Sequence, residues 1–205
     1  MTAPPTGLWG RLVSYAVAAA FTGLIIWMVK SPIFAVRAVD VHRADSSPPP
    51  VIDPRKIEDV VARLARGANI FRLNAGALRT AVRAQPGVAD AIVAVTLDGR
   101  VTVTVSYQAP VANWVVAGQS YVVSADGHVL AARYQPDLQL TVEDTSDGTV
   151  APGATVSADA LHAAYQLQNN LPFLRVVPTR FRYAPNSLLV IDHSGREILF
   201  GSTDR

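Results

Sequence analysis

The chain has 205 residues, of which 50% are hydrophobic and only 17% are charged, with a formal net charge of +2. This composition excludes a chain that is disordered over most of its length, and the charge is too small for a general nucleic-acid-binding protein. Because cysteine is absent, disulfide bonds, thiolate zinc sites and cysteine nucleophiles are excluded as well.

Residues 12–29 carry no charge and predict a transmembrane helix, preceded by a cytoplasmic tail at 1–11. A helix of this length spans about 27 Å, close to the ~30 Å hydrocarbon core of a bilayer. Ser31 and Pro32 then end the helix. A cleaved signal peptide is the alternative, but its apolar core is shorter and small residues follow it closely at the cleavage site. We therefore predict an uncleaved anchor.

Charge alone leaves the orientation of this anchor open. Arg11 precedes the helix, whereas Lys30, Arg37 and Arg43 follow it, so the positive-inside rule mildly favours a cytoplasmic C-terminal part. A long domain, however, crosses the membrane largely regardless of its charge.

The segment 33–110 predicts a domain that begins with a strand at 36–42 and continues with two helices. Asp53 is the expected N-cap of the first helix, which ends at Gly67. Asn74 is the expected N-cap of the second, which ends at Pro86-Gly87. The buried face of the first helix is expected to consist of Ile57, Val60, Val61 and Leu64.

Two strands close this domain. The mostly apolar run 88–97 predicts a strand in the centre of the sheet, and Asp98-Gly99 predicts a tight turn. Residues 101–107 alternate apolar and polar side chains, which predicts a second strand. The order strand, helix, helix, strand, strand places two helices on one face of a three-stranded sheet.

Beyond Pro110 short strands alternate with turns, which predicts a mainly-β domain at 111–205. One helix, capped by Ser157 and running to about residue 169, interrupts them, and 143–153 is expected to be a surface loop. The predicted fold class is therefore α+β. The expected turns are Gly118-Gln119, Asp126-Gly127, Pro185-Asn186 and Ser194-Gly195, between strands at 120–124, 128–132, 187–192 and 196–200.

Three motifs, in this order, resemble the FtsQ/DivIB cell-division proteins. They lie between the two helices, at the end of the second helix and at the start of the second domain. The second motif lacks the tryptophan that the family has between its proline and its valine. The resemblance implies that 33–110 is a POTRA domain and that the motif residues are structural. The matching residues are Gly67, Asn69, Phe71, Leu73, Pro86, Val88, Pro110, Val111, Ala112 and Trp114.

The resemblance also implies a function. Proteins of this family sit in the cytoplasmic membrane with the N-terminus in the cytoplasm and the bulk outside. They act at the division septum through FtsB/DivIC- and FtsL-like membrane partners. We expect the same of this chain: a divisome scaffold with no enzymatic activity, cofactor, small-molecule substrate or nucleic-acid partner.

Family members continue past the strand at 196–201 into a helix and a terminal strand that bind FtsB/DivIC. This chain ends at Arg205. Two interpretations stay open: the chain is a short or truncated member, or its partner contact differs.

We expect partners to add a β-strand to an open sheet edge, either at 101–107 or near 196–200. The alternative is an edge that the chain itself covers. The first domain is also locally basic, which favours either a solvated surface or a surface for acidic partners or lipid headgroups. The candidate partner surface consists of Arg79, Arg83, Arg196, Ile198 and Phe200.

Two other classes of function compete with the scaffold. A POTRA-type chaperone or protein-translocation module carries repeated POTRA units or a transmembrane barrel, neither of which fits in 205 residues. An envelope hydrolase needs a nucleophile or a metal site. The four histidines are dispersed, and no Gly-x-Ser-x-Gly, Ser-x-x-Lys or phosphate-binding glycine loop is present.

Overall fold

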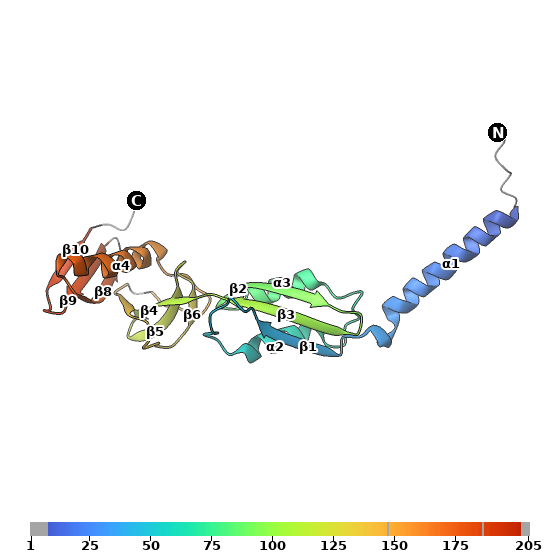
Figure 1. The fold of residues 1–205 in the computed structure, drawn as a ribbon, viewed down its shortest axis with the longest axis horizontal. Coiled ribbons are helices and arrows are strands. Elements are labelled where there is room, and N and C mark those ends of the chain that lie inside the picture. Colours follow the sequence, from blue (N-terminus) through green and yellow to red (C-terminus); the bar gives the residue numbers. More distant parts are fainter. Residues whose placement is uncertain (1–7, 147, 186, 202–205) are drawn as a thin grey trace, which may run out of the picture.

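The computed structural model describes residues 8–146, 148–185 and 187–201. The helix α1 (Leu8–Lys30) projects from one end of an elongated molecule (Figure 1). A three-stranded sheet with two helices follows it, and a seven-stranded sheet with one helix lies at the far end. The α+β class predicted from the sequence is confirmed.

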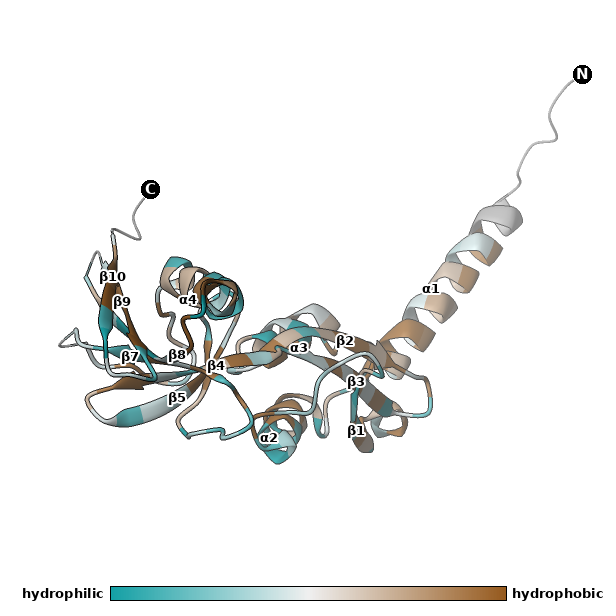
Figure 2. Ribbon diagram, turned by 60° about the vertical axis from the view of Figure 1, so that its left-hand side comes forward, coloured by the Kyte–Doolittle hydropathy of each residue, from teal (hydrophilic) through white to brown (hydrophobic). Residues whose placement is uncertain are grey.

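The helix α1 has the length and composition of a membrane-spanning segment. Its segment Leu12–Lys30 has a mean hydropathy of 2.1, and none of it is buried against the rest of the chain. Figure 2 shows that the half of α1 next to the first sheet is the more apolar. It is the one helix of this kind within the described residues. All of residues 12–29, the predicted membrane helix, lie in α1.

The first sheet has the strand order β1-β3-β2. The strand β1 (Ala38–Arg43) runs parallel to β3 (Arg100–Tyr107), and β2 (Val88–Val95) runs antiparallel to it. The helices α2 (Pro54–Ala65) and α3 (Ala75–Arg83) cover one face, so the βααββ order is confirmed. Two expectations about position are wrong. Residues 88–95 of the run 88–97 form the edge strand β2, and 101–107 lies in the central strand β3 and cannot be an open edge.

Local signals place the two helices as predicted. Asp53 accepts a hydrogen bond from Arg55 N at 3.0 Å, and Asn74 accepts one from Ala77 N at 2.9 Å. Gly67 adopts φ +78° after α2, a conformation that glycine reaches without strain. One helix-face prediction is wrong: Leu64 is 51% exposed, and Ala65 takes its place in the core. The core consists mainly of Ile57, Val61, Ala65, Leu78, Val82, Val101, Val103 and Val105.

The second sheet has the order β10-β9-β8-β7-β4-β5-β6. Its strands are β4 (Pro110–Val116), β5 (Gln119–Ser124), β6 (Val129–Ala131), β7 (Leu140–Asp144), β8 (Pro178–Ala184), β9 (Ser187–Asp192) and β10 (Glu197–Phe200). The strand β7 runs parallel to both β4 and β8 and thereby joins two groups of antiparallel strands. The helix α4 (Ala158–Asn170) packs on one face, with Ser157 as its N-cap, as predicted.

Several details of the second sheet differ from the sequence prediction. The predicted strands at 120–124, 187–192 and 196–200 correspond to β5, β9 and β10, and 128–132 shortens to β6. The strands β7 and β8 were not among the predicted runs. The loop expected at 143–153 is wrong in its first two residues, which belong to β7. Asn186, expected in a turn, lies outside the described residues.

A small apolar cluster joins the two sheets. Val51, from the loop before α2, packs with Val122 and Leu130 of the second sheet. The chain passes from β3, which ends at Tyr107, to β4, which begins at Pro110. A domain division at 110–111 remains a prediction.

Candidate partner-binding edge

The first family motif fastens α1 to the first sheet. Asn69 Nδ2 donates hydrogen bonds to the carbonyl oxygens of Met28 at 3.0 Å and Ser31 at 3.2 Å. Asn69 Oδ1 accepts a hydrogen bond from Phe71 N at 3.0 Å. The last carbonyl groups of a helix lack hydrogen-bond donors within the helix. The Asn69 amide, from a distant part of the chain, supplies hydrogen bonds to carbonyl groups at the end of α1. Gly67 forms the turn before Asn69, and Leu73, after it, packs against the core of the first sheet.

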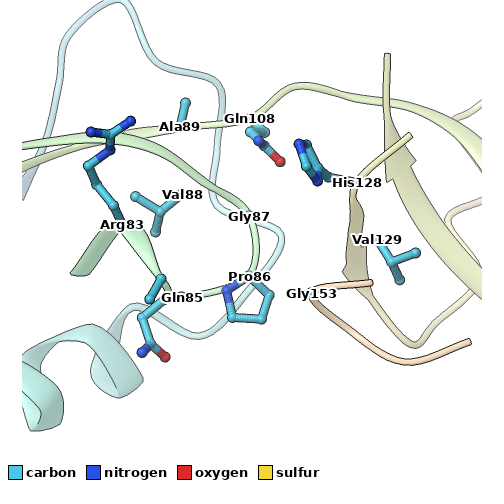
Figure 3. Close-up of a pocket in the computed structure, with 11 residues that line it drawn as sticks. Arg83, Gln85, Pro86, Gly87, Val88, Ala89, Gln108, His128, Val129 and Gly153 are labelled. Atoms are coloured by element: carbon cyan, nitrogen blue, oxygen red, sulfur yellow. The ribbon is translucent and has the colours of Figure 1, made fainter. Parts of the chain in front are cut away.

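The second motif lies at a cleft between the two sheets (Figure 3). Pro86 and Val88 line this cleft of about 360 Å³, and Gln108 and His128 extend toward each other across it. Its charged wall is Arg83, which already pairs with Asp90. The residues that line the cleft carry amide, imidazole, guanidinium and apolar groups. No serine, threonine or cysteine nucleophile lies among these lining residues beside His128.

The third motif forms the start of β4, which lies between β5 and β7. Ala112 and Trp114 are completely buried. The Trp114 indole N–H donates a hydrogen bond to Asp144 Oδ2 at 3.1 Å, and its ring lies 5.5 Å from that of Tyr183. Pro110 and Val111 are half-buried at the beginning of the strand. These residues form part of the core, so the motif contributes no exposed contact.

The candidate surface residues fall into two groups. Arg79 on α3 pairs with Asp90 on β2 at 2.9 Å, and Arg83 approaches the same carboxylate at 3.5 Å. The hydrogen bond from Arg79 is the main reason that the pKa of Asp90 is lowered. All three side chains are about half exposed, so these pairs add little stability. Arg196 directly precedes β10, which contains Ile198 and Phe200 and lies at the opposite end of the molecule (Figure 1).

The seven-stranded sheet has two edges, and the chain covers one of them. Beside β6, Val129 N donates a hydrogen bond to Ala154 O at 2.9 Å, and Gly153 N donates one to Val129 O at 2.9 Å. His128 also forms a bridge to Thr155. At the other edge β10 pairs with β9 on one side, and no described segment pairs with its other side. The open edge is therefore β10.

The register of β10 shows which of its backbone groups are free. At the turn, Asp192 N donates a hydrogen bond to Arg196 O at 3.1 Å. Hydrogen-bonded pairs alternate along an antiparallel ladder, so Ile198 and Phe200 bond to β9. The backbone N–H and C=O groups that point away from the sheet belong to Glu197 and Leu199.

Side chains alternate on β10 in the same way. Ile198 and Phe200 are half-buried on the face that α4 covers. Leu199 stands on the open face and is 67% exposed. A groove of about 310 Å³ runs beside β10 and α4, with Leu167 and Phe200 in its lining. The edge thus combines free backbone groups with an apolar groove.

Asp192, which was not predicted, holds the β9–β10 turn. Its side chain is fully buried and accepts hydrogen bonds from Ser194 Oγ at 2.6 Å and Arg196 Nε at 2.9 Å. The Ser194 hydroxyl is the main cause that keeps the pKa of Asp192 well below its usual range. Arg196 is therefore a turn residue. The signal in the sequence is an aspartate two residues before Ser194 and three before Gly195, the pattern of an Asx-turn.

Comparison with known proteins identifies a relative. No family model matches the sequence. The chain is 27% identical over 165 residues to the cell division protein FtsQ of Chloroflexus aurantiacus, across 80% of this chain. The resemblance to the FtsQ family is confirmed. The alignment covers 58% of that FtsQ, so the chain spans less than two thirds of its relative. In this FtsQ-like chain the motif residues connect α1 to the first sheet, line the cleft and contribute to the core of the second sheet, and β10 is the uncovered edge of that second sheet.

Proposed function

We propose that the chain is a single-pass membrane scaffold of cell division that binds partners by adding their strands to β10. The observation that carries this proposal is the uncovered edge, at which Glu197 and Leu199 direct backbone groups outward. The name of the FtsQ relative supports the role in division. By resemblance, the partners are FtsB/DivIC- and FtsL-like proteins, and the scaffold performs no covalent chemistry.

The strength of such a contact follows from the ladder. Two outward residues offer two N–H and two C=O groups, and each hydrogen bond contributes about 0.5–1.5 kcal/mol. The backbone contacts then sum to about 2–6 kcal/mol before the entropy of association is subtracted. Even without that subtraction, 2–6 kcal/mol corresponds to a Kd between about 30 mM and about 40 μM, so binding between free molecules is weak. Anchoring both partners in one membrane raises their effective concentration, so the weak contact suffices.

The groove gives the contact its specificity. An added strand places alternate side chains on the face covered by α4. One of these would lie over Leu167 and Phe200, so we expect an apolar residue there. On the other face of the sheet, the added strand lies beside Glu197 and Leu199. Because Leu199 is apolar and exposed, we expect an apolar residue next to it. The expected partner segment is a short strand with apolar residues on both faces.

We place the N-terminus in the cytoplasm and the two sheets outside, at the division septum. The FtsQ resemblance supports this orientation, because charge counting does not decide it. A permanent anchor is supported by Asn69, which binds the end of α1 and makes it part of the folded chain.

A proline at the outward-facing position tests the strand-addition mechanism. Leu199→Pro removes an N–H that is free in the isolated chain, and edge strands tolerate proline at such positions. In full-length protein, expressed in dividing cells, we expect loss of crosslinking to membrane partners and loss of their septal recruitment. The control Leu199→Ala keeps the N–H and should retain more crosslinking.

Unfolding measurements accompany this test, because a misfolded variant would also fail to bind. We expect Leu199→Pro to unfold at nearly the same temperature as the parent chain. Undiminished crosslinking in a folded Leu199→Pro protein would refute strand addition at β10. A fluorescent fusion spread evenly around the membrane would refute the division role itself.

A further inference from the structure

Three segments meet at the end of the first sheet that adjoins α1 (Figure 1). Ile70 N donates a hydrogen bond to Phe34 O, and Val36 N donates one to Ala68 O, both at 2.8 Å. Arg37 N donates a third to Gly99 O at 2.8 Å. Residues 30–37, 66–72 and 97–99 therefore form one continuous surface, which we call the junction surface.

The junction surface exposes large apolar side chains. Leu97 is 75% exposed, Ile33 56% and Phe71 43%. The Phe71 ring packs edge-on against Phe34 at 5.1 Å, and Phe34 packs in the same way against Trp27 at 6.3 Å. The aromatic row thus continues from α1 onto the domain. Aromatic side chains of this kind favour the interface between lipid and water.

The same surface is basic. Lys30, Arg37, Arg66 and Arg72 are exposed, and Asp98 is the one acidic residue in the three segments. Asp98 is not a free charge, because Thr96 donates a hydrogen bond to it and Arg100 lies 3.9 Å away. The contact with Thr96 is the main reason that the pKa of Asp98 is lowered.

A hollow of about 720 Å³ lies within this surface. Lys30 and Arg72 stand in its wall, together with Ser31 and Asn69. Neither cation forms a salt bridge within the described chain. Two unpaired cations beside a hollow of this size fit the phosphate of a lipid headgroup.

We propose that the junction surface docks on the bilayer, with its basic side chains on anionic phospholipid headgroups. Ile33, Phe71 and Leu97 enter the boundary between headgroups and acyl chains. This inference rests on the proposed membrane anchoring, since α1 ends at Lys30 and Asn69 binds its last carbonyl groups. Because these hydrogen bonds hold the domain beside the end of α1, we place its junction surface at headgroup depth.

The strength of docking depends on charge and on apolar contact together. A basic residue near an anionic membrane surface changes the docked-to-undocked ratio about fivefold. A combination of basic and apolar side chains is also the composition by which peripheral segments bind at the bilayer interface.

The absence of cysteine makes single-cysteine labelling possible in the full chain. We would place an environment-sensitive fluorophore at Leu97→Cys, with Leu174→Cys as the matched control. Leu174 is a similarly exposed leucine, at 73%, and lies between α4 and β8, away from the junction surface. The proteins are reconstituted in discs of phosphatidylcholine with or without phosphatidylglycerol. Quenching by iodide reports water access, and quenching by shallow spin-labelled lipid reports contact with the interface.

We expect the label at residue 97 to be shielded from iodide and quenched by lipid in anionic discs, and the label at residue 174 to remain open. Arg66→Gln and Arg72→Gln should each lower the docked-to-undocked ratio about fivefold, whereas the exposed Arg133→Gln should not change it. Equal iodide access at residues 97 and 174 would overturn docking. Shielding that is the same without phosphatidylglycerol would overturn the anionic-lipid assignment.

A label at Ala20→Cys, near the middle of α1 and read with lipid that carries its spin label deep in the acyl chain, separates this inference from the anchoring on which it rests. If lipid quenches the label at residue 20 while residue 97 stays open to iodide, anchoring holds and docking is wrong. If lipid does not quench the label at residue 20, the anchor itself is wrong and docking fails with it.

Discussion

Replacing Asn69 by aspartate tests the connection between α1 and the first sheet. The substitution is nearly isosteric and keeps Oδ1, which accepts the hydrogen bond from Phe71 N. It replaces the Nδ2 donor by an oxygen that faces the carbonyl oxygens of Met28 and Ser31, previously 3.0 and 3.2 Å from the amide nitrogen. The new negative charge also lies at the C-terminal end of a helix, where the helix dipole disfavours it.

The size of the effect follows from these contacts. Two lost hydrogen bonds cost about 0.5–1.5 kcal/mol each, or about 1–3 kcal/mol together. The charge at the helix end adds about 0.3–1 kcal/mol. A local destabilisation of about 1–4 kcal/mol corresponds to an increase of about fivefold to several hundredfold in the open population of the junction.

Hydrogen–deuterium exchange of the full chain in lipid discs measures this opening directly. Amides in residues 67–72 should exchange faster in Asn69→Asp by that factor, while the strands of the second sheet keep their rates. Asn74→Asp is the matched control, because the Asn74 side chain is an N-cap that, among the described residues, accepts a hydrogen bond and donates none, and aspartate caps equally well. Equal exchange rates at residues 67–72 in both variants would refute the conclusion that the Asn69 amide holds the end of α1 against the first sheet.

Two further predictions concern the second sheet. A Cβ at Gly127 would lie 2.5 Å from Val156 O, whereas Gly118 faces open space at the same φ of +79°. Gly118→Ala should therefore cost about 1–2 kcal/mol in unfolding free energy, and Gly127→Ala about 1–3 kcal/mol more; equal costs in chemical unfolding would contradict the clash. The lowered pKa of Asp192 means that its carboxylate stabilises the β9–β10 turn fully above the ordinary pKa of 3.8, and this contribution declines as the pH falls further. Asp192→Asn should abolish this acid dependence in exchange measurements on residues 187–200, and an unchanged profile would show that another group causes it.

The features that sequence could predict are local ones. The caps Asp53, Asn74 and Ser157 act within three residues of themselves, so the residue type and its position determine the contact. Gly67 is likewise a local signal, because a glycine directly after a helical pattern indicates the positive φ at which the helix ends. The βααββ order follows from these helix boundaries and from the alternation in 101–107.

Strand order was less accessible because it depends on residues far apart in the chain. The helices cover only one face of the first sheet, so its central strand alternates buried valines with half-exposed threonines. We predict an open edge at 101–107 and a central position for the more apolar run 88–97, and the strand order β1-β3-β2 makes both predictions wrong. The strand β7 pairs with β4 and β8 across long connections and has no neighbouring turn to mark it. Pairing over such distances leaves little trace in any short window.

The two proposals together explain a conflict in the sequence. Lys30 and Arg37 weigh against an outside location by the positive-inside rule, yet both belong to the junction surface. If that surface rests on anionic headgroups, these charges stabilise the docked domain on whichever side it lies. Docking also fixes the height and direction of the β10 edge, which lies at the opposite end of the molecule (Figure 1). A fixed edge samples fewer positions than one on a flexible tether, so its effective concentration toward a partner strand in the same membrane is higher. Variants that undock the junction surface should therefore weaken partner crosslinking at β10 without altering β10 itself.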